Sequence, residues 1–201
     1  MDADFDVGTL VNVHHNVPNN DQLQLDSQAT PFGFIWVAAS GRGTVVKIDT
    51  DSGDVLGEYL TAPGGGGNPS RTTVDSDGSV WVANRNLGSV VHIGLKENGQ
   101  CRNGGATTSS GLGNILTWNS ASPPGVGDAQ DDCIIHYQIV SSAGTRHVSV
   151  NSDNDVWVSG TTTQQFDLIK GGGPTVAGAG TILRTEPDPN AIPALPVQGG
   201  G

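Results

Sequence analysis

Five histidines and three glutamates are the residues of this chain that could carry proton-transfer or metal chemistry. A histidine and a glutamate that converge on a divalent metal can act as its acid and base groups. His147 is the best single candidate, because it aligns with Arg71 on an expected inner strand and would face a central channel or its rim. Glu58, Glu97 and Glu186 are not expected beside it. The sequence therefore predicts no complete catalytic set.

Three of the other histidines do not extend this site. His14 and His15 are neighbours, and successive residues of a strand point to opposite faces of the sheet. His92 aligns with Lys47 and Leu168 in the other copies of the repeat described below. A position that accepts histidine, lysine and leucine indicates a structural place on the surface of a sheet.

Short turns rich in aspartate could bind calcium. Two or three carboxylates in one turn, completed by backbone carbonyl groups, are ligands that Ca²⁺ accepts. The alternative is that an aspartate caps the backbone amides of its own turn. The candidate metal ligands are Asp49, Asp51, Asp75, Asp77, Asp153 and Asp155.

A second group of polar residues is expected on the opposite side of the same strands. Arginine donates forked hydrogen bonds to carboxylates, so this surface would suit ligands rich in hydroxyl or carboxylate groups. The alternative is that each arginine forms a salt bridge with a neighbouring aspartate. The candidate ligand-binding residues are Arg42, Arg71, Asn84, Arg85 and Asn86.

The elements that would position these residues come from a tryptophan-centred segment that occurs three times, at residues 34–38, 79–83 and 155–159. In each copy an isoleucine follows the tryptophan by twelve residues. Strand-rich units of roughly 40 to 50 residues that cannot bury their own faces are typical of β-propeller blades. The sequence therefore predicts an all-β fold, a β-propeller of four-stranded blades with three clear blades, preceded by strands of either a further, degenerate blade or a closing strand.

The second copy shows the expected strands most clearly, at residues 70–74, 79–83 and 88–93, with an Asp-Ser-Asp-Gly turn between the first two. An outer strand is expected at 54–59 in the first copy and at 181–184 in the third. For the outer strand of the second copy, residues 114–118 and 134–139 are equally suitable. Two further segments alternate as strands do, at 9–13 and 21–25.

We expect one propeller domain over residues 1–201, with an insertion at 98–133 and a tail rich in proline and glycine at 186–201. Closed propellers use typically four to eight blades, and three or four blades would leave sheet faces and edges open. The alternatives are a compact four-bladed ring, an arc completed by another copy, and part of a longer propeller. The last two together are favoured.

Composition and charge limit the partners. A formal charge of −11 repels phosphate backbones and anionic lipid surfaces, so nucleic-acid and membrane partners are not expected. No apolar run reaches the roughly 18 residues of a membrane span. A disulfide between Cys101 and Cys133 is expected, which requires an oxidising compartment; the alternative is two unpaired thiols.

Residues 74–84, with the sequence Val-Asp-Ser-Asp-Gly-Ser-Val-Trp-Val-Ala-Asn, resemble the repeat of streptogramin lyase and NHL-type propellers. The resemblance extends over about 32–185 without the insertion, and residues 4–13 and 35–44 also resemble secreted, multi-domain bacterial propellers. Some of these carry a calcium-binding loop after the second blade, but residues 99–105 lack its acidic ligands.

These observations favour a non-catalytic extracellular β-propeller that acts as a binding or structural module and associates with itself or with neighbouring propeller domains. Calcium is its expected ion. The resemblance implies one alternative, a metal-dependent lyase or lactonase, with His147 at its centre.

Overall fold

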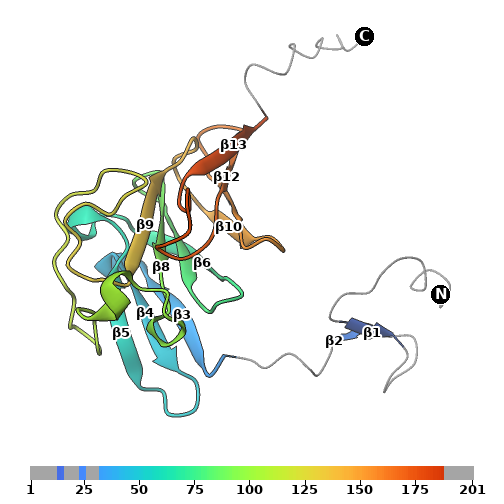
Figure 1. Ribbon diagram of the computed structural model, residues 1–201. Helices are drawn as coiled ribbons and strands as arrows, with labels where there is room; N and C mark the ends of the chain where they lie inside the picture. Colours follow the sequence, from blue (N-terminus) through green and yellow to red (C-terminus); the bar gives the residue numbers. More distant parts are fainter. Residues whose placement is uncertain (1–12, 16–22, 26–31, 188–201) are drawn as a thin grey trace, which may run out of the picture. The chain divides into compact units, whose positions relative to one another are not determined.

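The computed structural model describes residues 13–15, 23–25 and 32–187, and divides the chain into two compact units, Met1–Gly33 and Phe34–Gly201 (Figure 1). In the first unit β1 (Val13–His15) pairs in antiparallel fashion with β2 (Leu23–Leu25). β2 lies within the second of the two N-terminal segments expected to form strands. Residues 9–12 of the first segment lie outside the described residues.

The second unit consists of three antiparallel sheets in sequence order. The first sheet contains β3 (Phe34–Ala39), β4 (Thr44–Asp49) and β5 (Val55–Leu60). The second contains β6 (Pro69–Val74), β7 (Val80–Asn84), β8 (Ser89–Ile93) and β9 (Ile134–Ile139). The third contains β10 (His147–Val150), β11 (Val156–Ser159), β12 (Phe166–Ile169) and β13 (Ile182–Glu186).

The fold class is therefore all-β, as predicted, and two of the three sheets have four strands. The only helices in the described residues are short 3₁₀ turns. They are η1 (Ser40–Arg42), η2 (Pro63–Gly65), η3 (Lys96–Asn98) and η4 (Arg102–Gly105). None of the described helices has the length and apolar character needed to cross a membrane.

The three repeated tryptophans occupy the same place in successive sheets. Trp81 and Trp157 lie on the second strand of a four-stranded sheet, and Trp36 lies on the first strand of the three-stranded sheet. Each tryptophan pairs across to the residue eleven positions later, on the next strand. The pairs are Trp36 with Lys47, Trp81 with His92, and Trp157 with Leu168. The repeat read from the sequence is therefore a structural repeat.

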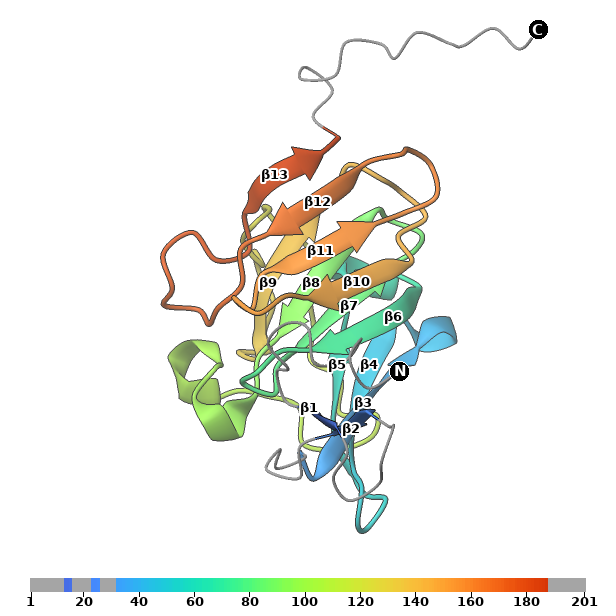
Figure 2. The same cartoon turned by 90° about the vertical axis from the view of Figure 1, so that its right-hand side faces the viewer.

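The sheets stack face to face through the side that carries the tryptophan. Figure 2 shows the three sheets one above another, with the second sheet in the middle. Trp36 packs in one apolar cluster with residues of the second sheet such as Val82 and Ile93. Trp81 packs in another cluster with Val148 and Val158 of the third sheet. Burial of these faces is the main source of stability in such a stack.

The turns at residues 75–78 and 151–154 join neighbouring sheets through hydrogen bonds. Gly78 and Asn154 take the same turn position in two copies, with φ of 83° and 63°, a conformation that suits glycine and asparagine. The indole Nε1 of Trp36 donates to the carbonyl of Gly78 over 3.1 Å. The backbone N–H of Ser76 donates to Asn154 Oδ1 over 3.0 Å.

The insertion leaves β8 and returns as β9. The predicted disulfide between Cys101 and Cys133 is present and ties the start of the insertion to its end. Residues 114–118 form no strand, and 134–139 supply the outer strand of the second sheet. Arg102 holds the returning segment, since its guanidinium donates to the carbonyl groups of Ala129, Asp131 and Ile134.

Candidate functional site

The polar residues predicted to form a ligand-binding face lie partly on strands, with Arg71 on β6 and Asn84 at the end of β7, and partly on loops; most of them bond within the protein. Arg42 Nη2 lies 2.8 Å from Glu58 Oε2, and that carboxylate is fully buried. Arg85 Nη2 donates to Asn68 Oδ1 over 2.9 Å, and Arg71 Nη1 donates to the carbonyl of Ser70. The acid that pairs with Arg42 is thus a glutamate and not a neighbouring aspartate.

The two asparagines of this group differ in exposure. Asn84 is buried, and its Nδ2 donates to the carbonyl of Thr61 and to Ser89 Oγ. Asn86 is exposed, and its backbone N–H donates to the carbonyl of Gly67. Ser40 Oγ donates to the carbonyl of Pro69, which joins two of these loops. Ligand binding at this face stays a prediction.

The aspartate turns use their carboxylates as caps. Asp49 Oδ1 accepts hydrogen bonds from the backbone N–H groups of Asp51 and Ser52, and these bonds lower the pKa of Asp49. Asp75 Oδ1 accepts from the N–H groups of Asp77 and Ser79. Asp49 and Asp75 therefore cap the backbone amides of their own turns, which is the alternative to calcium binding.

In the third copy an asparagine takes over the cap. Asn151 Oδ1 accepts from the backbone N–H groups of Asp153 and Asp155, and Asp155 Oδ1 accepts from that of Gly171. In the part of the chain that the structure describes, no three His, Cys, Asp or Glu side chains are grouped so that they could hold a metal ion. Calcium binding stays a prediction.

His147 lies on the free face of the third sheet, in a row that crosses all four strands. The row consists of His147, Ser159, Phe166 and Glu186, which are cross-strand partners in that order. Glu186 belongs to this row because β13 extends two residues beyond the segment expected from the sequence, but it lies on the outer strand and not beside His147.

The two side chains nevertheless do not converge. Neighbouring strands lie about 4.8 Å apart, so three strand spacings separate the backbones of His147 and Glu186 by roughly 14 Å. Both line an open hollow of about 580 Å³ together with Trp157 and Phe166. The hollow is an apolar surface with a polar rim.

This hollow lies on the tryptophan face of the third sheet. In the first and second sheets, the same face packs against the sheet that follows. Trp36 and Trp81 are 7% and 0% exposed, whereas Trp157 is only half-buried and Phe166 is 48% exposed. Arg184 lies over the Trp157 ring, with its guanidinium carbon 5.1 Å from the ring centroid. Within residues 34–187, no further sheet covers this face.

A buried polar chain lies between the second and third sheets. His92 stacks on Trp81 with ring centroids 4.1 Å apart, and its Nε2 lies 3.2 Å from Asp75 Oδ2. Its Nδ1 lies 3.3 Å from Nδ1 of His136. His92 is thus 1% exposed, inside the interface and not on an outer surface.

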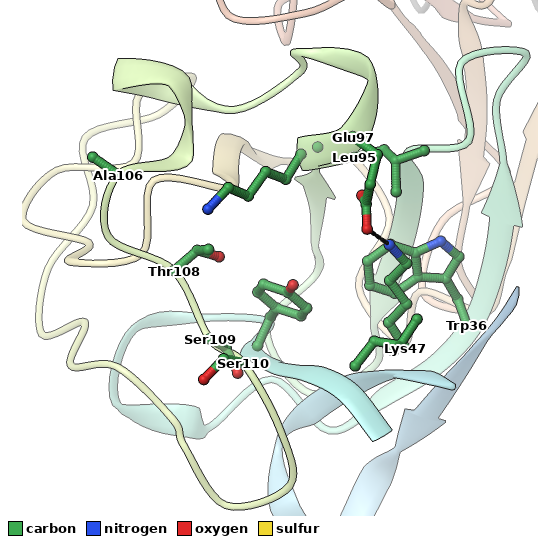
Figure 3. Close-up of a pocket in the computed structure, with 12 residues that line it drawn as sticks. Trp36, Lys47, Leu95, Glu97, Ala106, Thr108, Ser109 and Ser110 are labelled. Carbon is green, nitrogen blue, oxygen red and sulfur yellow. Dashed lines mark hydrogen bonds and ion pairs between the residues drawn. The ribbon is translucent and has the colours of Figure 1, made fainter. Parts of the chain in front are cut away.

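The first sheet, the segment around η3 and the insertion line a cavity of about 250 Å³, shown in Figure 3. Lys47 on β4 and Tyr59 on β5 line one side, and insertion residues 106–110 line the other. Lys47 Nζ forms an ion pair of 2.7 Å with Glu97 Oε1, drawn as a dashed line. One feature of the sequence points to this cavity: Lys47 interrupts an apolar strand, and it pairs with Trp36 on the neighbouring strand.

No family model matches the chain, and no curated protein sequence matches it. Solved structures with a similar chain path include the following three. One is a streptogramin B lyase, with 14% sequence identity over 72% of this chain and 36% of that one, and a TM-score of 0.45. A catalytically inactive virginiamycin B lyase from Staphylococcus aureus with quinupristin has 16% identity over 73% and 37%, and a TM-score of 0.43.

The third structure is a selenomethionine-substituted virginiamycin B lyase from Staphylococcus aureus. It has 18% identity over 79% of this chain and 42% of that one, and a TM-score of 0.42. The chain thus spans less than half the length of each of these structures.

Proposed function

We propose that this protein is an open arc of a β-propeller that acts without catalysis, as an extracellular binding module that associates with copies of itself. The observation that carries the proposal is the open tryptophan face of the third sheet. The disulfide between Cys101 and Cys133 supports an extracellular place, because disulfides persist in oxidising compartments.

The repeat itself indicates what kind of surface covers the Trp157 face. Inside the stack, the face of each sheet with its tryptophan packs on the opposite face of the following sheet. Large aromatic side chains such as Trp157 and Phe166 each bury about 150 to 250 Å² when covered. At roughly 25 cal/mol per Å², covering both contributes several kcal/mol to association.

A complementary surface lies at the other end of the stack. Ile35 and Val37 flank Trp36 on β3 and therefore point away from the second sheet, and they are 49% and 42% exposed. A second copy that places this face on the Trp157 face would continue the stack. Such a head-to-tail contact closes into a ring or extends as a filament, according to its rotation.

The first prediction concerns the size of the particle in solution. Light scattering across a range of protein concentrations should show wild-type protein larger than one chain. Trp157→Arg on the one face, or Ile35→Glu on the other, should reduce it to a monomer because each places a charge in an apolar contact. Leu112→Ser, at a 63% exposed position of the insertion, is the matched control and should leave the size unchanged.

A mixture of the two face variants tests the geometry. In a head-to-tail contact, the intact Trp157 face of the Ile35→Glu protein can still pair with the intact β3 face of the Trp157→Arg protein. The equimolar mixture should therefore form dimers while each variant alone stays monomeric. A wild-type protein that is monomeric at every concentration would contradict the proposal.

A further inference from the structure

The cavity beside Lys47 and Tyr59 of the first sheet is independent of the open end faces. It lies beside β4 and β5, and the turn of η3 and the insertion complete its walls (Figure 3). Nothing in the proposed association uses it.

The row that begins at the tryptophan differs between the first two sheets in its third residue. In the second sheet the row of Trp81 continues through His92 to His136, and a Cβ built on Gly180 would meet the His136 ring at 2.7 Å. That interface is therefore filled. In the first sheet the corresponding row runs from Trp36 through Lys47 to Gly57, which has no side chain.

Tyr59 uses part of the space that Gly57 leaves. A Cβ at Gly57 would lie 2.5 Å from the Tyr59 hydroxyl oxygen, so the Tyr59 side chain lies directly over the glycine. The remaining space is bounded by the aromatic side chains of Tyr59 and Trp36 on one side. Burial first, and then the nearby Asp131 carboxylate, raise the pKa of Tyr59 to about 12, so the hydroxyl stays protonated and can donate.

The cavity contains a buried cation with few partners. The Lys47 side chain is 5% exposed, and Glu97 is the one hydrogen-bond acceptor that the described residues give its ammonium group, which has three donors. Its Nζ also lies 4.5 Å from the Phe34 ring centroid and 6.0 Å from that of Trp36. Because the Glu97 side chain is 62% exposed, its carboxylate can turn into solvent at little cost.

The lining has a positive balance in an otherwise acidic protein. Lys96 is a second lysine of the lining, so two cations face the single carboxylate of Glu97. The opposite wall presents the hydroxyl-bearing residues Thr108, Ser109 and Ser110. An anionic group is therefore favoured near Lys47, with hydroxyl partners across the cavity.

The hydroxyl wall is fixed before any ligand arrives. Asp131 is 2% exposed, and its carboxylate accepts from Thr108 Oγ1 over 2.9 Å and from the backbone N–H of Ser109 over 3.0 Å. Asp131 in turn lies two residues before Cys133 of the disulfide. A preformed wall lowers the cost of binding.

We propose that this cavity binds a monosaccharide-sized hydroxycarboxylate, such as a sugar acid. Its carboxylate replaces that of Glu97 as an acceptor for Lys47, its apolar ring face lies against Tyr59, and its hydroxyl groups reach Thr108 and Ser110. The volume of about 250 Å³ is below the roughly 300 to 1,000 Å³ of sites for drug-sized molecules, which limits the ligand to a single small ring or chain.

The test is a titration followed by two-dimensional NMR of the Trp36 indole N–H, which is fixed by its bond to Gly78. The probes are glucuronate, galacturonate and gluconate, with glucose as their neutral counterpart. At least one acid should give saturable shifts, and glucose should bind at least about tenfold more weakly. Lys47→Gln should weaken binding of the acid by about tenfold or more, while Lys170→Gln, outside the cavity, should leave it unchanged.

A second variant separates binding from folding. Ala106 is exposed and lines the cavity, so Ala106→Phe should fill it without removing a buried contact and should abolish the shifts. The absence of saturable shifts with all three acids would overturn the proposal. Equal binding of glucose, or unchanged binding to a folded Ala106→Phe protein, would overturn it as well.

Discussion

His92 and His136 form a buried pair whose hydrogen bonds are satisfied only by a definite arrangement of protons. If His92 donates from Nε2 to Asp75, its Nδ1 accepts, and His136 donates to it from its own Nδ1. Both rings are then neutral. Burial lowers the pKa of His92, against the opposing effect of Asp75 and Asp77. Burial, and then the neighbouring His92, lower the pKa of His136 to about 3.

The second prediction is a loss of stability on mild acidification. The unfolded chain protonates these histidines near pH 6.5, and the folded protein does so only at lower pH, near 3 for His136. As the pH falls below 6.5 the unfolded state takes up more protons, so the free energy of unfolding decreases by up to about 1.4 kcal/mol per pH unit for each histidine. Urea unfolding between pH 7.5 and 5 measures this slope, and stability should be nearly flat above pH 7.

Two variants isolate the contribution of His136. In His136→Asn the amide nitrogen can take the place of Nδ1 but does not titrate, so the slope below pH 6.5 should become shallower. Lys170→Gln, which keeps both histidines and removes only a hydrogen bond to the carbonyl of Ala177, should leave the slope as it is in the wild type. An equal slope in the wild type and in His136→Asn would show that this ring is not held neutral.

At the scale of elements, the disulfide adds stability to the insertion. Cys101 and Cys133 are 32 residues apart, and a cross-link over such a loop stabilises by about 3 to 4 kcal/mol in the chain-entropy model. Arg102 and Asp131 hold the same segment through hydrogen bonds, so the folded insertion should persist after reduction.

The third prediction is that the paired change Cys101→Ser and Cys133→Ser lowers the free energy of unfolding by about 3 to 4 kcal/mol while the sheets remain. Urea unfolding of this protein, compared with the oxidised and the reduced wild type, measures the effect. Reduced wild type should behave as the double variant does. If neither reduction nor the paired substitution lowers the free energy of unfolding, opening the loop does not raise the conformational entropy of the unfolded chain enough to matter.

The strands could be predicted from the sequence where the repeat is regular. The twelve-residue spacing from tryptophan to isoleucine gave β4, β8 and β12, since strand length and turn length are both fixed by that spacing. The choice between 114–118 and 134–139 could not be made, because both runs have apolar, strand-forming residues. In the structure, residues 134–139 pair with the free edge of β8. That edge exists only in the folded sheet, so the sequence does not show which segment pairs with it.

The cavity could not be predicted from local sequence. It depends on the absence of a side chain at Gly57 and on insertion residues some fifty positions further along the chain, which meet only in the fold. His92 shows the same limit, since its partners Asp75 and His136 lie on different elements and only the structure shows that the three are buried together.

At the scale of the whole molecule, the three sheets make a short one-dimensional array. The second sheet is covered on both faces, and the first and third are each covered on one by their neighbour. Stability in such an array is approximately the sum of the terms within each unit and the terms between nearest neighbours. The end sheets therefore lack one of the contacts that the middle sheet has.

This difference determines the order in which the molecule comes apart. Every residue of β7 and β8 is buried, whereas β3 and β10 each alternate between covered and exposed positions. In native-state hydrogen exchange on dilute protein, the amides of β7 and β8 should exchange most slowly and report global unfolding, while those of β10 exchange through partial opening. Equal protection of β10 and β8 would show that the three sheets unfold cooperatively as one unit. Lower protection of β10 would mean that association with another copy stabilises the end sheets more than the middle sheet.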